Sequence, residues 1–185
     1  MNETELRIST IGHSNRTLEE LIALLTDAKI VCLVDVRRYP VSKRHPHFDT
    51  HNLRRACDQA QINYHWAGEH LGGYRPALAG SPHTALSDGL RGFADYMASE
   101  AFVQSISRLI DLAKTSPTAI LCAEKHPQDC HRLLISDYLW TSGVVVEHLT
   151  EKGRCDGHRL SHCARLTQGK LIYDRLTQQS LALDL

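Results

Sequence analysis

The sequence predicts one α/β domain with a mainly parallel sheet flanked by helices, on the basis of three observations. The chain has 185 residues, the usual length for one domain that buries its own core. Short apolar runs alternate with longer segments of helical periodicity, which is typical of βαβ units. The most reactive polar residues directly follow the short apolar runs. We therefore expect a buried sheet with functional residues on loops at its carboxyl edge.

The first part of the chain predicts three strands and two helices. The strands are expected at residues 6–11, 31–36 and 62–66, and the helices at residues 18–25 and 50–61. Thr17 followed by Glu20 is a capping-box signature, so the first helix should begin directly after Thr17. The polar stretch from residue 37 to Phe48 contains two prolines and is expected to be a long loop.

The remainder of the chain continues the alternation. Residues 69–87 contain several glycines and prolines and are expected to form a loop that is a candidate lid. Helices are expected at residues 102–113 and 130–140, and strands at 119–122, 144–149 and 171–173, with an irregular segment at 151–168. No repeat or linker divides the sequence, so residues 1–185 are interpreted as a single domain in which 151–185 form a C-terminal extension.

Composition narrows the class of protein. The formal net charge is zero, although residues 37–75 hold seven Arg or Lys against three Asp or Glu. The whole molecule therefore exerts no long-range attraction on nucleic acid, while the sequence still allows a local basic patch at residues 37–75. The sequence contains neither a membrane-spanning run nor a signal peptide, so we expect a cytoplasmic protein that does not interact with membranes. Its six cysteines are then expected to be reduced thiols.

Candidate catalytic residues follow three of the predicted strands. His13 is a candidate acid–base group because imidazole titrates near neutral pH, or it caps the following turn. Asp35 is a candidate general base, or it orients Arg37 through an ion pair. Arg37 and Arg38 offer bidentate recognition of phosphate or carboxylate, and Arg37 is closer to the strand end. Glu124 is a candidate acid–base carboxylate, expected beside Asp35 if their strands are neighbours.

The segment from Cys122 to Arg132 links a buried strand to a helix. Backbone N–H groups at the start of that helix favour an anion, and His131 and Arg132 add hydrogen-bond donors or charge. A thiol at a helix start has a lowered pKa, so Cys130 is a candidate nucleophile, with His131 beside it. The alternative is that Cys130 only begins the helix. Cys122 is expected to be a small core residue.

Four residues near the C-terminus are weak candidates for zinc ligands. They are Cys155, His158, His162 and Cys163. The set lacks a repeated C-x-x-C pattern, so the main expectation is that the chain binds no metal there. The sequence does not identify a cofactor or an oligomeric state.

Several short motifs resemble the DUF488 family of bacterial and archaeal proteins. The matching stretches are Thr10-Ile-Gly-His-Ser14, Asp35-Val-Arg37 with Pro40 and Ser42, Leu71-Gly-Gly73 with Arg75, and Cys122-Ala-Glu124 with Cys130-His-Arg132. The resemblance implies that these positions form one site, but it supplies no substrate and no reaction. The residues expected to bind substrate are Ser14, Arg37, Ser42, Gly72, Gly73, Arg75, Cys122 and Arg132.

A weaker similarity connects the chain to rhodanese-like and related phosphatase domains. It rests on Val34-Asp-Val-Arg37 and on the strand-end Cys122. In those domains a short cysteine loop binds an anion, whereas here Arg132 lies ten residues after Cys122. Sulfur transfer is therefore a second hypothesis, with Cys130 as the reactive thiol.

The leading hypothesis is an enzyme, either a hydrolase or a group transferase, that acts on a phosphate-bearing substrate such as a nucleotide or nucleic acid. Asp35 and Glu124 would carry out acid–base chemistry with His13 assisting, and Arg37, Arg75 and Arg132 would hold the anion. A third hypothesis is a non-catalytic nucleic-acid-binding module. It would use the basic region 37–75 and the aromatic residues Tyr39, Phe48, Tyr64, Trp66 and Tyr74.

Overall fold

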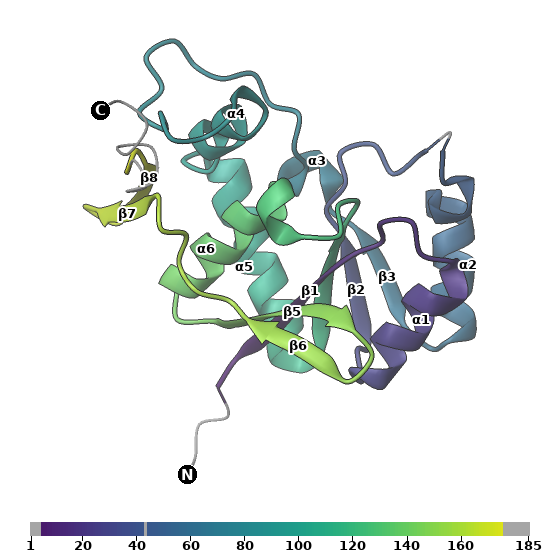
Figure 1. Cartoon of the computed structure of the whole chain (residues 1–185). Helices are drawn as coiled ribbons and strands as arrows, with labels where there is room; N and C mark the ends of the chain where they lie inside the picture. Colours follow the sequence, from purple (N-terminus) through teal and green to yellow (C-terminus); the bar gives the residue numbers. More distant parts are fainter. Residues whose placement is uncertain (1–4, 43, 176–185) are drawn as a thin grey trace, which may run out of the picture.

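A six-stranded sheet forms the centre of the computed structural model, with strand order β3-β2-β4-β1-β5-β6 (Figure 1). The structure describes residues 5–42 and 44–175, so residues 1–4, 43 and 176–185 of the predicted domain lie outside the described residues. The strands are β1 (Arg7–Gly12), β2 (Cys32–Asp35), β3 (Asn63–Trp66), β4 (Thr118–Cys122), β5 (Val145–Glu151) and β6 (Arg154–Gly157). β1 to β5 are parallel and β6 is antiparallel to β5, which confirms the predicted fold class.

Helices cover both faces of the sheet. They are α1 (Leu18–Asp27), α2 (Thr50–Gln59), α3 (Gly68–Leu71), α4 (Asp88–Tyr96), α5 (Glu100–Thr115) and α6 (Arg132–Thr141). α1 and α2 lie on one face, and α5 and α6 lie on the other (Figure 1). Short 3-10 turns at Pro46–Phe48 (η1) and Pro127–Asp129 (η2) precede α2 and α6, and a hairpin of β7 (Ala164–Thr167) and β8 (Lys170–Tyr173) is separate from the sheet.

Two apolar clusters fill the spaces between the sheet and its helices. Successive side chains of a strand point to opposite faces. In β4, Ile120 and Cys122 belong to the cluster with Phe102 of α5, whereas Leu121 belongs to the cluster with Leu25 of α1. Burying a Leu, Ile or Phe side chain contributes roughly 1.5–3 kcal/mol, so both layers hold the sheet in place.

Most predicted elements are confirmed, with differences at their ends. The capping box at Thr17 and Glu20 is present, with both reciprocal hydrogen bonds. The predicted helix at 130–140 begins instead at Arg132, because η2 occupies Pro127–Asp129 and Cys130 is extended (φ −145°, ψ 148°). The segment expected to be irregular, 151–168, contains β6 and β7, and the predicted loop at 69–87 overlaps α3.

Two further findings concern the chain as a whole. In the described part of the chain, none of the helices is long and apolar enough to cross a membrane. All six cysteines are free, as predicted, and four of them are buried.

The connections out of β1 and β4 determine where a site can form. These two strands are neighbours, and the chain leaves β1 toward α1 on one face but leaves β4 toward α6 on the other. Loops that diverge in this way open a crevice at the carboxyl ends of parallel strands, where ligands of α/β proteins bind. His13, Arg37 and Glu124 all follow strands at this edge.

Candidate active site at the carboxyl edge of the sheet

A cavity of roughly 1010 Å³ lies at the carboxyl ends of β1, β2 and β4. Its size suits a small organic ligand. The predicted site residues that line it are His13, Ser14, Arg37, Ser42, Gly73, Cys122, Glu124, Cys130 and His131. Asp35, Gly72, Arg75 and Arg132 were also predicted for the site but do not line the cavity. The predicted motifs therefore lie together at this edge of the sheet. Some of their residues form the cavity wall, and the others lie outside it.

Asp35 is fully buried and holds the side chain of Arg37. Its Oδ1 accepts from Nε of Arg37 at 2.9 Å, and its Oδ2 accepts from Nη2 at 2.6 Å. The hydroxyl of Tyr64 also donates to Oδ2, at 2.8 Å. Both carboxylate oxygens are thus occupied, as expected for the orienting role that the sequence left open for Asp35. A catalytic role for this residue stays a prediction.

Arg37 is held in a single orientation at the cavity wall. Its Nη2 donates to the carbonyl oxygen of Phe48 at 2.9 Å, in addition to the two bonds with Asp35. Within residues 5–42 and 44–175, Nη1 of Arg37 has no hydrogen-bond partner, although its side chain is only 6% exposed. A fixed guanidinium with one unused N–H₂ group is a ready donor to an anion in the cavity.

His13 lies on the wall with its ring stacked on Phe48, at a centroid distance of 4.3 Å. Its Nδ1 is 2.9 Å from the carbonyl oxygen of Ser14, which can only accept, so Nδ1 carries the proton. Burial lowers the pKa of His13 to about 4, and the ring is neutral at pH 7. Its Nε2 is then an unprotonated acceptor. Ser14 has a left-handed backbone (φ 52°), a conformation that is uncommon for a residue with a side chain.

Glu124 is exposed and lines the cavity, and its main chain is fixed by Arg132. The guanidinium of Arg132 is 1% exposed, and its Nη2 donates to the carbonyls of Glu124 at 3.0 Å and Lys125 at 3.2 Å. The predicted anion-binding Arg132 is therefore directed at main-chain carbonyls behind the wall. Gly12 packs against the same loop, because a Cβ at that position would lie 1.7 Å from the carbonyl oxygen of Glu124.

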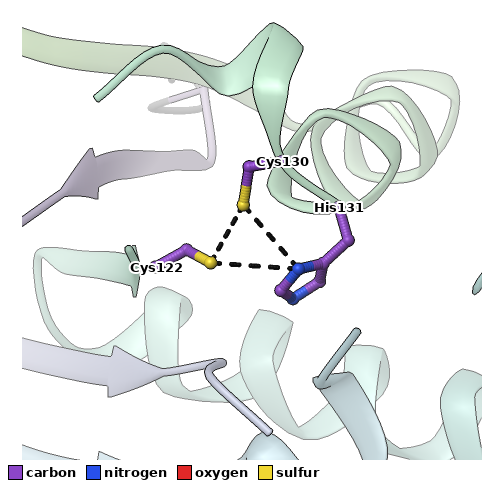
Figure 2. Close-up of side chains that lie close together, drawn as sticks. All are labelled: Cys122, Cys130 and His131. Atoms are coloured by element: carbon purple, nitrogen blue, oxygen red, sulfur yellow. Dashed lines mark hydrogen bonds between the residues drawn. The ribbon is translucent and has the colours of Figure 1, made fainter. Parts of the chain in front are cut away.

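Cys122, Cys130 and His131 form a compact buried group (Figure 2). The thiol of Cys130 donates to Sγ of Cys122 at 2.9 Å, and His131 Nδ1 lies 3.8 Å from Cys122 Sγ and 3.7 Å from Cys130 Sγ. This S–H···S bond lowers the pKa of Cys122, while the same bond and burial raise the pKa of Cys130 well above its usual value. The prediction of a lowered pKa for Cys130 is therefore wrong. Cys130 precedes the helix by two residues and is itself buried.

The other predicted residues support the wall indirectly. Arg75 lies over the ring of Tyr96, with its Cζ 3.8 Å from the ring centroid, and donates to the carbonyl of Gly72. A Cβ at Gly72 would meet the carbonyl oxygen of Gly68 at 2.2 Å. Ser42 lines the cavity and accepts the N–H of His45 at 3.0 Å.

Several wall residues were missed by the sequence reasoning. They are Asn15, Val41, Arg44, His45, Ser87, Gly89, Leu90, Ala123, Gln128 and Asp129. Arg44 and His45 lie in the predicted long loop, whose polar character was the available signal. Among the aromatic residues named for the nucleic-acid-binding hypothesis, Phe48 and Tyr64 are buried and cannot stack on a ligand. Tyr39 and Tyr74 are exposed, line the cavity and lie 6.2 Å apart by ring centroid.

The four weak zinc candidates do not form one cluster. Cys155 is exposed on β6, whereas His158, His162 and Cys163 line a second cavity of roughly 690 Å³. Among the described residues, the group of three potential ligands with atoms within 4.8 Å of one another is Cys122, Cys130 and His131.

His158 belongs instead to a buried chain of hydrogen bonds. Thr10 Oγ1 is 2.7 Å from His148 Nδ1, His148 Nε2 is 3.1 Å from His158 Nδ1, and His158 Nε2 is 3.0 Å from Asp137 Oδ1. Arg132 Nη1 donates to Thr10 at 3.3 Å. The chain thus runs from the loop of Glu124 to the wall of the second cavity. Burial lowers the pKa of His148 to about 4.

The fold and the site define an α/β protein with a ligand cavity at the carboxyl edge of its sheet. Comparison with known families places the chain in one of them: the family described as Domain of unknown function DUF488 matches residues 17–139, more than half of the sequence. The chain belongs to this family. The match includes Asp35, Cys122 and Cys130 but begins after His13. A search of curated proteins and a search of solved structures each found no match, and no finding supports the weaker similarity to rhodanese-like domains.

Proposed function

We propose that this chain is an enzyme, a hydrolase or group transferase, that acts on a phosphate-bearing substrate in the cavity. The observation that carries the proposal is the state of Arg37, which is buried at the wall and fixed by Asp35, while its Nη1 has no hydrogen-bond partner among the described residues. A preorganised guanidinium loses little further entropy when it binds an anion. Arg38 and Arg44 line the same cavity, and their added positive charge favours phosphate over a single carboxylate.

Three residues have separate roles in this proposal. Glu124 is the acid–base carboxylate, because it is exposed at the wall on a loop that Arg132 fixes. His13 assists as a neutral hydrogen-bond acceptor through Nε2. Asp35 is a positioning residue for Arg37, and this role is favoured over general-base catalysis because its carboxylate is buried and fully bonded.

A nucleotide, or the end of a nucleic acid, is the substrate class that the cavity favours. Tyr39 and Tyr74 offer two exposed rings beside the arginines, and nucleobases stack on such rings. Tyr74 has a positive φ of 60°, a backbone conformation that residues with a side chain rarely adopt. In this conformation its ring lies at the cavity wall. A cytoplasmic location remains our prediction, because six free thiols persist most readily in a reducing compartment.

The test is turnover of defined phosphate compounds. Phosphate release would be measured from nucleoside mono-, di- and triphosphates and from p-nitrophenyl phosphate, with binding followed by calorimetry. Glu124→Gln should lower kcat by roughly 10²–10⁴-fold with little change in substrate affinity. Arg37→Met should weaken binding, and Asp35→Asn should raise KM more than it lowers kcat, because the arginine is still present but less well oriented.

Glu151→Gln and Arg108→Met serve as controls, since both side chains are exposed and neither lines the cavity. Circular dichroism checks that each variant is folded. The proposal fails if none of these phosphate compounds binds, or if folded Glu124→Gln turns over as fast as the parent chain.

Thiol chemistry is a second candidate function, favoured by the 2.9 Å separation of the two sulfur atoms at the cavity wall. In this alternative the attacking sulfur of a sulfur-transfer or thiol enzyme is assigned to Cys122 in place of Cys130, because Cys122 accepts the S–H bond. Alkylation of Cys122 or Cys130 that is faster than that of the exposed thiol of Cys155 would favour this alternative, and slower alkylation of both would contradict it.

A further inference from the structure

Three side chains with metal-binding atoms point to one place at the cavity wall (Figure 2). Cys122 is the last residue of β4, Cys130 follows the η2 turn, and His131 is the N-cap of α6. Two sulfur atoms and one imidazole nitrogen thus lie within 4.8 Å of one another. All three residues are buried, and all three line the cavity.

Three distances separate the two sulfur atoms and the imidazole nitrogen, and two of them match the distances between ligand atoms in a zinc site. With Zn–S near 2.3 Å and Zn–N near 2.05 Å, a tetrahedral site has S···N edges of about 3.6 Å and an S···S edge of about 3.8 Å. The observed S···N distances are 3.7 and 3.8 Å. The S···S distance of 2.9 Å is shorter than that edge, and here the thiol of Cys130 donates to Cys122. Zinc binding removes the protons of both thiols, and the two thiolates then repel each other and separate toward the edge length.

His131 is held in the tautomer that a metal ligand requires. Its Nε2 is 3.2 Å from the carbonyl oxygen of Val36, which can only accept, so Nε2 carries the proton. The lone pair of Nδ1 then faces the two sulfurs. A backbone carbonyl bonded to the other ring nitrogen is the usual outer-shell support of a metal-binding histidine. Gly73 leaves this edge clear, because a Cβ there would lie 3.0 Å from Nδ1.

The donor set also selects the ion. Thiolate and imidazole ligands favour zinc over magnesium or calcium, which prefer oxygen. Zn²⁺ with two thiolates and one neutral imidazole has no net charge, so the filled site introduces no uncompensated charge into this buried position. The backbone N–H of Arg132 lies 3.4 Å from Cys130 Sγ and supports the sulfur in that state.

We propose that Cys122, Cys130 and His131 form a zinc site whose fourth position opens into the cavity. Three protein ligands with one open position are the pattern of catalytic zinc, whereas structural sites are closed by four. Zinc binding itself does not depend on the proposed function, but the use of the ion does.

In a phosphate ester hydrolase, water at the fourth position would give a proton to Glu124 while its oxygen forms a bond to phosphorus. The bond from phosphorus to the leaving oxygen would break, and Glu124 would return its proton to the leaving oxygen. Zinc would thereby supply the nucleophile that the proposed function needs.

Metal uptake by the full chain tests the site without any substrate. Reduced, metal-free protein would be titrated with Zn²⁺ against a chromophoric chelator, and with Co²⁺ as a spectroscopic probe. We expect one equivalent of each ion, a sulfur-to-cobalt charge-transfer band and visible bands of tetrahedral intensity. Cys122→Ser and His131→Gln should each weaken Zn²⁺ binding by at least about tenfold. Cys155→Ser, at an exposed thiol outside the site, should bind as the parent does.

Alkylation followed by mass spectrometry gives a second measurement that needs no variant. Zn²⁺ should protect Cys122 and Cys130 but leave Cys155 reactive. The zinc site is overturned if the reduced parent chain takes up no stoichiometric ion, if folded Cys122→Ser binds Zn²⁺ unchanged, or if Cys122 and Cys130 form a disulfide in the presence of Zn²⁺. Arg37→Met should lose phosphate binding yet keep zinc, so that failure of the proposed function is distinguishable from failure of the site.

Discussion

Among the glycines, Gly12 has the least room for a side chain. A Cβ there would lie 1.7 Å from the carbonyl oxygen of Glu124, so Gly12→Ala must displace the loop that carries Glu124. We expect this substitution to lower the free energy of unfolding by at least about 2 kcal/mol. Urea denaturation measures the change.

Gly89→Ala is the matched control, because a Cβ at Gly89 meets nothing within 4 Å and the residue lies in α4. Alanine favours a helix over glycine, so this variant should be as stable as the parent or more stable by up to about 1 kcal/mol. Equal destabilisation by the two substitutions would show that the loop does not depend on close packing at Gly12.

Single residues also show what a sequence can predict about a site. His13 and Glu124 were predicted because each follows a strand, and strand ends of a parallel sheet meet at one edge, whereas Cys122 was named for the site through the family resemblance. The destination of a hydrogen bond is a tertiary property, so the sequence could not show that Arg132 would donate to main-chain carbonyls. Nor could it distinguish the thiol of Cys122 from that of Cys130, whose pKa values depend on a contact between segments.

At the scale of elements, the capping box is the clearest local signal in the chain. Thr17 accepts the N–H of Glu20, and the Glu20 carboxylate accepts the N–H of Thr17. Thr17→Ala should lower the free energy of unfolding by about 1 kcal/mol, since α1 loses one of its end bonds. Thr26→Ala, exposed in the same helix, should have little effect. Thermal denaturation of the two variants decides whether the cap contributes.

Elements without such a local signal were not predicted. α4 contains Gly89 and Gly92, which lower helix propensity, and Gly92 is required because a Cβ there would meet the carbonyl oxygen of Arg75 at 2.0 Å. β6 is exposed at all four positions, so its sequence lacks the alternation that marks a half-buried strand. Both α4 and β6 form because of their contacts with neighbouring elements in the fold. The hydrophobic periodicity of a short sequence segment does not reveal such contacts.

At the scale of the whole molecule, two buried histidines connect stability to pH. The pKa values of His13 and His148 are lowered from 6.5 to about 4, chiefly by burial. The unfolded chain therefore binds more protons than the folded chain between these values, and stability rises with pH there. Stability is full above pH 6.5 and falls as the pH drops toward 4, by roughly 2–3 kcal/mol for each histidine.

Urea unfolding at pH values from 4.5 to 7.5 measures this loss. His148→Gln should flatten the profile, because the residue that faces His158, Arg132, Asp156 and Asp137 no longer titrates. If folding becomes too weak in this variant, the NMR titration of the His148 ring in the parent chain gives the same information. A flat stability profile, or a His148 ring that titrates near 6.5, would contradict the prediction.

The buried chain of side chains between the two cavities has a fixed direction. Arg132 can only donate at one end, and the carboxyl group of Asp137 accepts from Ser161 at the other. Thr10 therefore donates to His148, Nε2 of His148 faces Nδ1 of His158, and Nε2 of His158 faces Asp137. The two ends of this row of hydrogen bonds thus set the donor-to-acceptor direction of every bond in it. If one hydrogen bond reversed its direction, all the others would have to reverse as well. The row thus connects the carbonyl of Glu124, through Arg132, to Ser161 at the wall of the second cavity, whose N–H and hydroxyl donate to Asp137.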